Sequence, residues 1–178
     1  MGSIPIAPNQ SQDRTGLICR FHAGYRLRLV GDSANNDGIQ AEMDFGYQTR
    51  KFFDGRLTLE TGSTLDLFGE TEHLAAYIQA NFHPKDRWVL ALRAMGGGVS
   101  DDKEPSRTST APSGSAEAQD SDDFGGIFEA SLLTFYQLDQ NFSLGTRLGY
   151  NLQHFGKAEG DQGTQHSLLT LLNLAYYF

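Results

Sequence analysis

The chain has 178 residues, with 20 glycines, five prolines and one cysteine. This length fits a single domain, and the lone Cys19 excludes an internal disulfide framework and every multi-cysteine metal site. The formal net charge of -8 argues against a nucleic-acid-binding surface, which needs clustered basic residues to replace the counterions on phosphate.

Membrane-spanning helices need roughly 20 consecutive apolar residues, and no segment of the sequence approaches that length. The start of the chain also lacks a charged region followed by an apolar one, so we expect any secretory signal to be absent or already removed. A negative mean hydropathy does not exclude the membrane, because barrel strands alternate lipid-facing and inward-facing residues. The alternation itself is therefore the informative pattern.

Eight segments alternate between apolar and polar residues with a period of two, which predicts eight β-strands. They lie at about residues 20–29, 40–48, 57–67, 74–82, 88–94, 128–136, 142–153 and 167–178. Asp54-Gly55 is a hairpin signal between the second and third segments, and His83 to Asp86 forms a turn between the fourth and fifth. Each segment has roughly the 9–11 residues that a tilted strand needs to cross a bilayer.

Two stretches break the alternation. Residues 99–123 are rich in Ser, Thr, Pro and Gly and carry seven acidic residues against two basic ones, which predicts a long solvated loop. Residues 1–19 include Pro5 and Pro8 and lack the period of two. We therefore expect an N-terminal periplasmic segment over 1–19 and a β-barrel over 20–178, with 99–123 as a long extracellular loop.

The alternation fits both a soluble barrel with an apolar interior, such as a lipocalin, and a membrane barrel with an apolar outside. Two observations favour the membrane barrel. Short connections fall at one end of the predicted barrel and long ones at the other, which is the outer-membrane arrangement. Large aromatic residues of the apolar parity gather at the short-turn end, as an interfacial girdle does. They are Phe21, Tyr47, Phe82, Trp88, Tyr136, Phe142, Tyr176 and Phe178.

The last strand adds a third observation, because it alternates up to a terminal aromatic residue through Leu174, Tyr176 and Phe178. In this respect the chain resembles bacterial outer-membrane β-barrel proteins as a class, whose C-terminal strand carries an aromatic signal read by the insertion machinery. The resemblance implies a bacterial outer-membrane location. The expected fold is an all-β, eight-stranded, antiparallel, up-and-down transmembrane β-barrel.

The polar parity predicts a charged interior. If the first hairpin pairs residues whose numbers sum to 70, Arg28 faces Glu42 and Arg26 faces Asp44, and such cross-strand ion pairs are favourable. An eight-stranded barrel has room for side chains and little else, so we expect a hydrogen-bonded plug, with a narrow or gated pore as the alternative. The predicted ion-pair network comprises Arg26, Arg28, Glu42, Asp44, Glu60, Asp66, Arg93, Glu129 and Arg147.

The histidines are the candidates for chemistry. In the last hairpin, a pairing sum of 320 sets His154 opposite His166 on the outer face, where two imidazoles could share a metal or act on a lipid headgroup. Small barrels that modify lipid A place catalytic residues near that rim, but Ser167 has the inward parity and no motif of those enzymes is present. His22 and His73 have the polar parity and belong to the plug. We predict no catalytic residue, no metal site and no cofactor.

The sequence therefore predicts a non-enzymatic outer-membrane barrel that serves as a structural anchor, a surface-display protein or a subunit of an envelope complex. A narrow porin-like channel and, less favoured, a lipid A-modifying enzyme are the alternatives. The expected partners are outer-membrane lipids and lipopolysaccharide, and a protein could bind through residues 1–19 or the loop 99–123. No nucleic-acid partner is expected.

Overall fold

The computed structural model describes residues 15–30, 38–68, 72–85, 87–101, 123–155 and 163–178. These residues form eight β-strands in one closed barrel, and each strand is hydrogen-bonded to its neighbours in chain order. The strands are β1 (Gly16–Val30), β2 (Gly38–Gln48), β3 (Leu57–Phe68), β4 (Glu72–Lys85), β5 (Trp88–Asp101), β6 (Asp123–Gln137), β7 (Phe142–Phe155) and β8 (Gly163–Tyr177). The expected fold class is confirmed. Among the described residues no helix is long and apolar enough to cross a membrane.

The barrel closes between its first and last strands. β8 pairs antiparallel with β1, from Ile18 opposite Tyr177 to Val30 opposite His166. Near the C-terminus the amide of Phe178 donates to the carbonyl oxygen of Leu17 at 3.1 Å. Closure leaves the sheet without an exposed edge, so the backbone polar groups of the strands are paired within the sheet, as a hydrocarbon environment requires.

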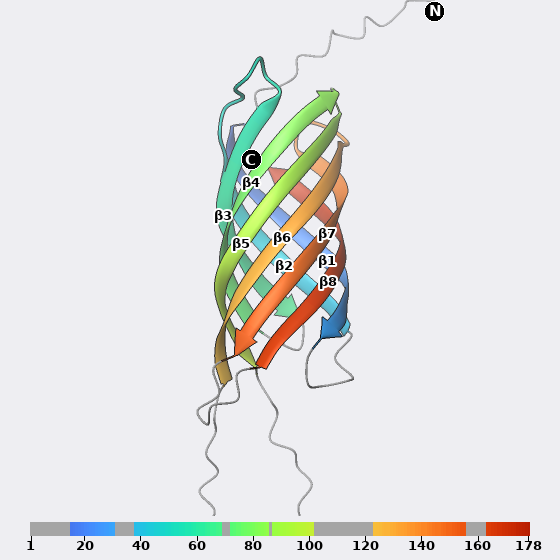
Figure 1. Ribbon diagram of the computed structural model, residues 1–178. Coiled ribbons are helices and arrows are strands. Elements are labelled where there is room, and N and C mark those ends of the chain that lie inside the picture. Colours follow the sequence, from blue (N-terminus) through green and yellow to red (C-terminus); the bar gives the residue numbers. More distant parts are fainter. Residues whose placement is uncertain (1–14, 31–37, 69–71, 86, 102–122, 156–162) are drawn as a thin grey trace, which may run out of the picture.

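The two ends of the barrel differ in the length of their connections. At one end, which we name the short-turn end, the strands are joined by residues 49–56, 86–87 and 138–141; at the other, the long-loop end, the connections include 31–37, 102–122 and 156–162. The tilted strands run between these ends, with the β2–β3 hairpin rising above the rim (Figure 1). β1 begins at Gly16 rather than at residue 20, and the segment before it lies outside the described residues, as does most of the predicted loop 99–123.

The β2–β3 hairpin shows how local sequence shapes a short turn. Phe52 and Leu57 exchange backbone hydrogen bonds of 2.8 and 3.2 Å, which closes the loop over the four residues between them. Within it Phe53, Asp54 and Gly55 have φ values of 49, 54 and 79°. Glycine tolerates this left-handed region without steric cost and aspartate is among the better side chains for it, which explains the Asp54-Gly55 signal.

Candidate functional site: the lumen and the outer surface

The inward-facing residues of the barrel include a set of buried charges that balance. Four arginines and four carboxylates are buried: Arg20, Arg26, Arg93, Arg147, Glu42, Asp44, Glu60 and Glu129. Arg28 and Asp66, also predicted for the network, are half-buried. All nine predicted network residues thus have the inward parity, and Arg20 is a member that the prediction left out. A balanced set of buried charges avoids the cost of an isolated buried ion.

The predicted register of the first hairpin is wrong. In the structure the backbone register sets Arg20 opposite Asp44, His22 opposite Glu42, and Arg26 opposite Gly38 on the neighbouring strand. A slip by an even number of residues keeps every side chain on its predicted face, so parity could not reveal the error. Its physical reason is the stagger that barrel closure imposes on neighbouring strands: β1 extends past β2 at the long-loop end and pairs there with β8.

Asp44 lies at the centre of one group of lumenal contacts. Its carboxylate accepts hydrogen bonds from Arg93 of β5 at 2.5 and 3.2 Å, and from the Thr64 hydroxyl of β3 at 2.8 Å. His22 Nε2 of β1 lies 2.8 Å from the same carboxylate. The guanidinium of Arg93 also stacks over the Tyr77 ring, 3.8 Å from its centroid. One carboxylate therefore ties side chains from three other strands together inside the lumen.

Glu60 organises a second group. Arg20 of β1 binds both carboxylate oxygens of Glu60 through its two terminal nitrogens, a bidentate pair that spans the intervening strand β2. The Tyr77 hydroxyl donates to Glu60 at 2.7 Å. That hydroxyl lies over the paired residues Gly46 and Gly62, where an added Cβ would come within 2.2 and 2.7 Å of it. At Gly46 the tyrosine hydroxyl is the nearest obstacle to a Cβ, whereas at Gly62 the backbone oxygen of Phe45 is nearer still, at 2.2 Å.

Arg147 joins strands on opposite sides of the barrel. From β7 it donates to Glu42 of β2 at 2.6 Å and, through Nε, to Glu129 of β6 at 2.8 Å. Its second terminal nitrogen also contacts Glu129. An arginine fork held by two carboxylates from different strands crosses the lumen itself, so the space where a conduit would run holds paired side chains.

Apolar residues also fill part of the interior, which the sequence reasoning did not predict. One inward cluster comprises Val89, Ala91, Leu133 and Phe135 and another Ile18, Ala175 and Tyr177. The first cluster lies at the start of β5 and the end of β6, and the second lies at the start of β1 and the end of β8. Both clusters are therefore at the short-turn end. Adjacent apolar pairs such as Leu132-Leu133 break strict alternation and were the signal that one member points inward. At this end apolar side chains therefore share the interior with buried polar ones such as Gln48 and Asn81.

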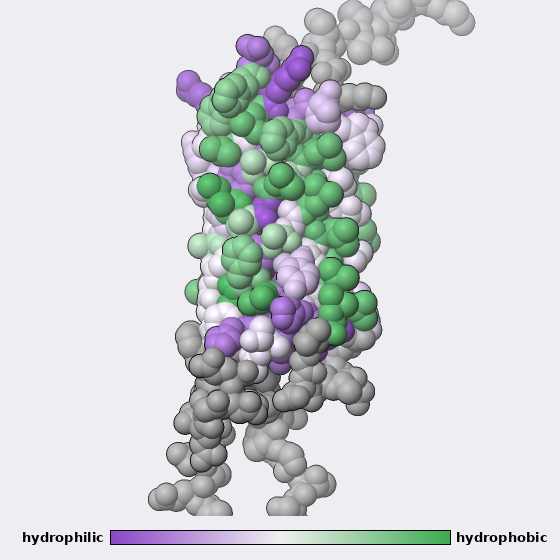
Figure 2. Space-filling model, viewed as in Figure 1, coloured by the Kyte–Doolittle hydropathy of each residue, from purple (hydrophilic) through white to green (hydrophobic). Residues whose placement is uncertain are grey.

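The outer surface of the barrel is apolar between more polar ends (Figure 2). Large hydrophobic side chains from all eight strands are exposed on it, among them Leu27, Phe45, Leu65, Ile78, Leu92, Leu132, Leu144 and Leu172. A monomeric soluble protein rarely exposes a continuous apolar surface of this extent. The lipocalin-type alternative, which needs these residues in its interior, is thereby excluded.

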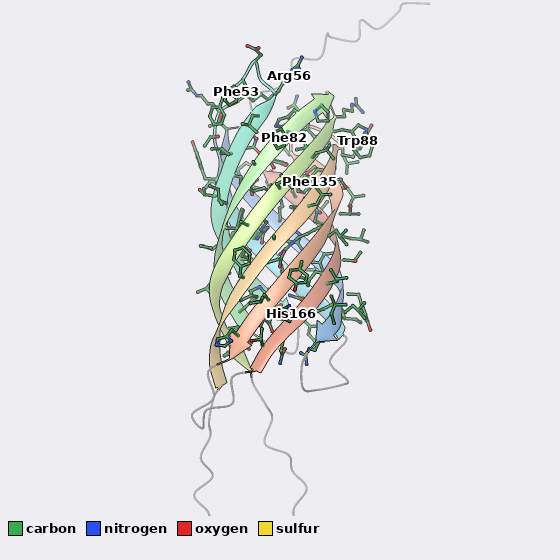
Figure 3. The ribbon with its side chains drawn as sticks, in the orientation of Figure 1. Phe53, Arg56, Phe82, Trp88, Phe135 and His166 are labelled. Carbon is green, nitrogen blue, oxygen red and sulfur yellow. The ribbon has the colours of Figure 1, made fainter. Side chains whose placement is uncertain are left out.

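The predicted aromatic girdle residues lie on the outer surface near the short-turn end. Phe21, Tyr47, Phe82, Trp88, Phe142 and Phe178 are exposed. Tyr136 and Tyr176 are half-buried because rings pack edge to face, with centroids 5.2 Å apart for Trp88–Tyr136 and 4.9 Å apart for Phe142–Tyr176. Phe82 and Trp88 lie toward the same end as Phe53 and Arg56, and His166 lies toward the other end (Figure 3).

The predicted pairing of His154 with His166 is wrong as well. His166 lies opposite Leu152, and His154 lies opposite Thr164. The His166 ring instead contacts the Tyr150 hydroxyl through Nδ1. Among the residues that the structure describes, no group of three or more His, Cys, Asp or Glu side chains could hold a metal ion.

The closed sheet, the apolar outer wall and the internally paired charges define the class: this chain is a transmembrane β-barrel of the bacterial outer-membrane type. No protein-family model matches the chain, and no curated protein matches its sequence. The chain aligns with three solved structures at low sequence identity.

The crystal structure of Neisserial surface protein A aligns with a TM-score of 0.44 at 14% identity, over 92% of this chain and 97% of that one. The Yersinia pestis outer membrane protein Ail, in a phospholipid bilayer nanodisc, aligns with a TM-score of 0.34 at 12% identity, over 92% and 99%. The KdgM porin aligns with a TM-score of 0.27 at 13% identity, over 91% and 99%.

Proposed function

We propose that this chain acts as a non-conducting, non-enzymatic barrel of the outer membrane, which anchors chain segments outside the barrel at the cell envelope. The observation that carries the proposal is the Arg147 bridge across the lumen from β7 to β2 and β6. Together with the apolar clusters at the short-turn end, it supports a barrel whose interior serves stability rather than transport. Contacts with partner molecules would then be made by the chain segments outside the barrel.

A conductance measurement tests the non-conducting part. The purified barrel inserted in a planar bilayer is expected to give no single-channel steps. The comparison variant combines Arg147→Ala, Glu42→Ala and Glu129→Ala, which removes the bridge across the lumen without leaving either carboxylate unpaired, and this variant is expected to conduct. Reproducible steps from the unaltered barrel at the same frequency as from the variant would overturn the proposal in favour of a pore.

The non-enzymatic part is tested on lipid. Lipid A from cells that express the barrel is expected to have the same mass as lipid A from cells that do not, because the outward His154 and His166 have neither an outward serine nor a carboxylate beside them among the described residues. Loss or gain of an acyl chain, abolished by His166→Ala, would make the chain a lipid-modifying enzyme.

The contact-making part is tested by deletion. The full-length chain is compared with variants that lack residues 1–14 or 104–120, which keep all eight strands and a four-residue connection between β5 and β6, in capture from native outer membranes. We expect a protein retained by the full chain and lost with one of the two deletions. Identical retention by all three forms would remove both segments from the proposal.

A further inference from the structure

The outer surface carries a groove over β3 to β8. Its volume is about 650 Å³, within the roughly 300–1,000 Å³ typical of small-molecule sites. Three alanines, Ala80, Ala94 and Ala130, face it together with larger residues such as Leu92 and Leu148. Ala94 and Ala130 are directly paired across β5 and β6, so two short side chains adjoin at one level and leave the hollow between their bulkier neighbours.

The groove opens onto the surface that faces lipid. Its lining consists mainly of outward-facing apolar residues, continuous with the hydrophobic wall of the barrel. An unfilled hollow forfeits dispersion contacts for every atom that lines it, so hydrocarbon from the bilayer is the material that fits. A flexible, unbranched acyl chain matches a hollow bounded by aliphatic side chains.

One edge of the groove is polar. Tyr150 lines the groove and pairs with Ala130, and its hydroxyl contacts His166 Nδ1, with the two ring centroids 5.9 Å apart. Either direction of this hydrogen bond leaves one donor free: Nε2–H of the neutral imidazole when the hydroxyl donates to Nδ1, or the tyrosine O–H when Nδ1–H donates to the hydroxyl oxygen. The edge therefore offers a donor that suits the oxygens of a phosphate.

The polar edge also lies at the height of a headgroup. Tyr150 follows Phe142 of the girdle by eight residues on the same face of β7. At roughly 3.3 Å per residue and a tilt of about 40°, it lies about 20 Å above Phe142 along the barrel axis. The apolar band of such barrels is about 25 Å tall, so Tyr150 and His166 lie near the membrane boundary at the long-loop end.

We propose that this groove binds one acyl chain of lipid A, the phosphorylated lipid of the outer leaflet, and that Tyr150 and His166 hold its headgroup. The inference rests on the proposed function only for the placement of the barrel in the outer membrane, and it takes the long-loop end as the outward one, as long connections at one end of such barrels imply. It adds a defined lipid site, which neither the pore nor the partner experiment addresses.

The acyl-chain part is tested by filling the groove. Ala94→Leu with Ala130→Leu is expected to lower the affinity for lipid A roughly tenfold, because the added carbons displace about two methylene groups of the bound chain. The matched control is Ala23→Leu with Ala41→Leu, a paired alanine couple on β1 and β2 outside the groove lining, and it is expected to bind like the unaltered barrel. Equal affinity of all three forms, measured by native mass spectrometry of the folded barrel, would overturn the proposal.

The headgroup part is tested with His166→Ala. This variant is expected to lose several-fold affinity for lipid A and to match the unaltered barrel on enzymatically dephosphorylated lipid A. Loss of affinity for both lipids would show that His166 shapes the groove without contacting phosphate, which overturns the headgroup assignment. Equal binding of phosphatidylglycerol and lipid A by the unaltered barrel would overturn the assignment to lipid A. None of these outcomes depends on whether the barrel conducts or captures a protein.

Discussion

The buried pair of Arg20 and Glu60 gives the sharpest test of the lumenal network. Arg20 is 1% exposed and Glu60 0%, and they form a bidentate contact from β1 to β3. Glu60→Gln leaves a buried guanidinium without its countercharge, and Arg20→Met leaves a buried carboxylate with the Tyr77 hydroxyl and Gln79 as donors. Each single change is expected to lower the free energy of unfolding by about 3–5 kcal/mol.

The double variant is expected to cost less than the sum of the two single changes, by about 2 kcal/mol, because no charge is then left alone. Urea unfolding in lipid vesicles measures this, with the fluorescence of Trp88, the chain's one tryptophan, as the signal. The matched comparison is Arg26→Met with Asp44→Asn, the pair that a shifted register would have joined. Here Asp44 binds Arg93 instead, so the coupling is expected to lie within about 0.5 kcal/mol. Additive losses for Arg20 and Glu60, or strong coupling of Arg26 with Asp44, would refute the described register.

Three further predictions follow from single positions. Gly145→Ala is expected to lower the free energy of unfolding by about 3 kcal/mol, because the new Cβ would lie 2.0 Å from a backbone oxygen of the neighbouring strand. Gly126→Ala, where the atom nearest to the new Cβ is 4.0 Å away, is expected to change it by no more than about 0.5 kcal/mol. Equal unfolding midpoints for the two variants would contradict this packing. Tyr77→Phe removes the 2.7 Å hydrogen bond to Glu60 and is expected to cost about 1.5–3 kcal/mol in urea unfolding, since the acceptor is a buried charge. Trp88 belongs to the exposed girdle, so lipids brominated near the headgroup are expected to quench its fluorescence more than lipids brominated near the chain end; the reverse order would place the girdle at the bilayer centre.

The sequence was sufficient for much of the fold. A period of two over eight segments determines the number of strands and the face on which each side chain lies, because successive Cβ atoms of a strand point to opposite sides. It therefore placed Glu42, Arg93 and Arg147 inside and Trp88 and Phe142 outside, where the structure has them. The short connections at one end also followed from turn residues such as Asp54-Gly55.

Tertiary structure alone decided which inward residues meet. The stagger of a closed barrel shifts each strand along its neighbour, and even shifts leave the alternation unchanged. For that reason Arg20 pairs with Glu60 two strands away and Arg147 reaches Glu42 across the lumen. His166 likewise contacts Tyr150 instead of His154, because the register of β7 with β8 is a property of the whole closed sheet.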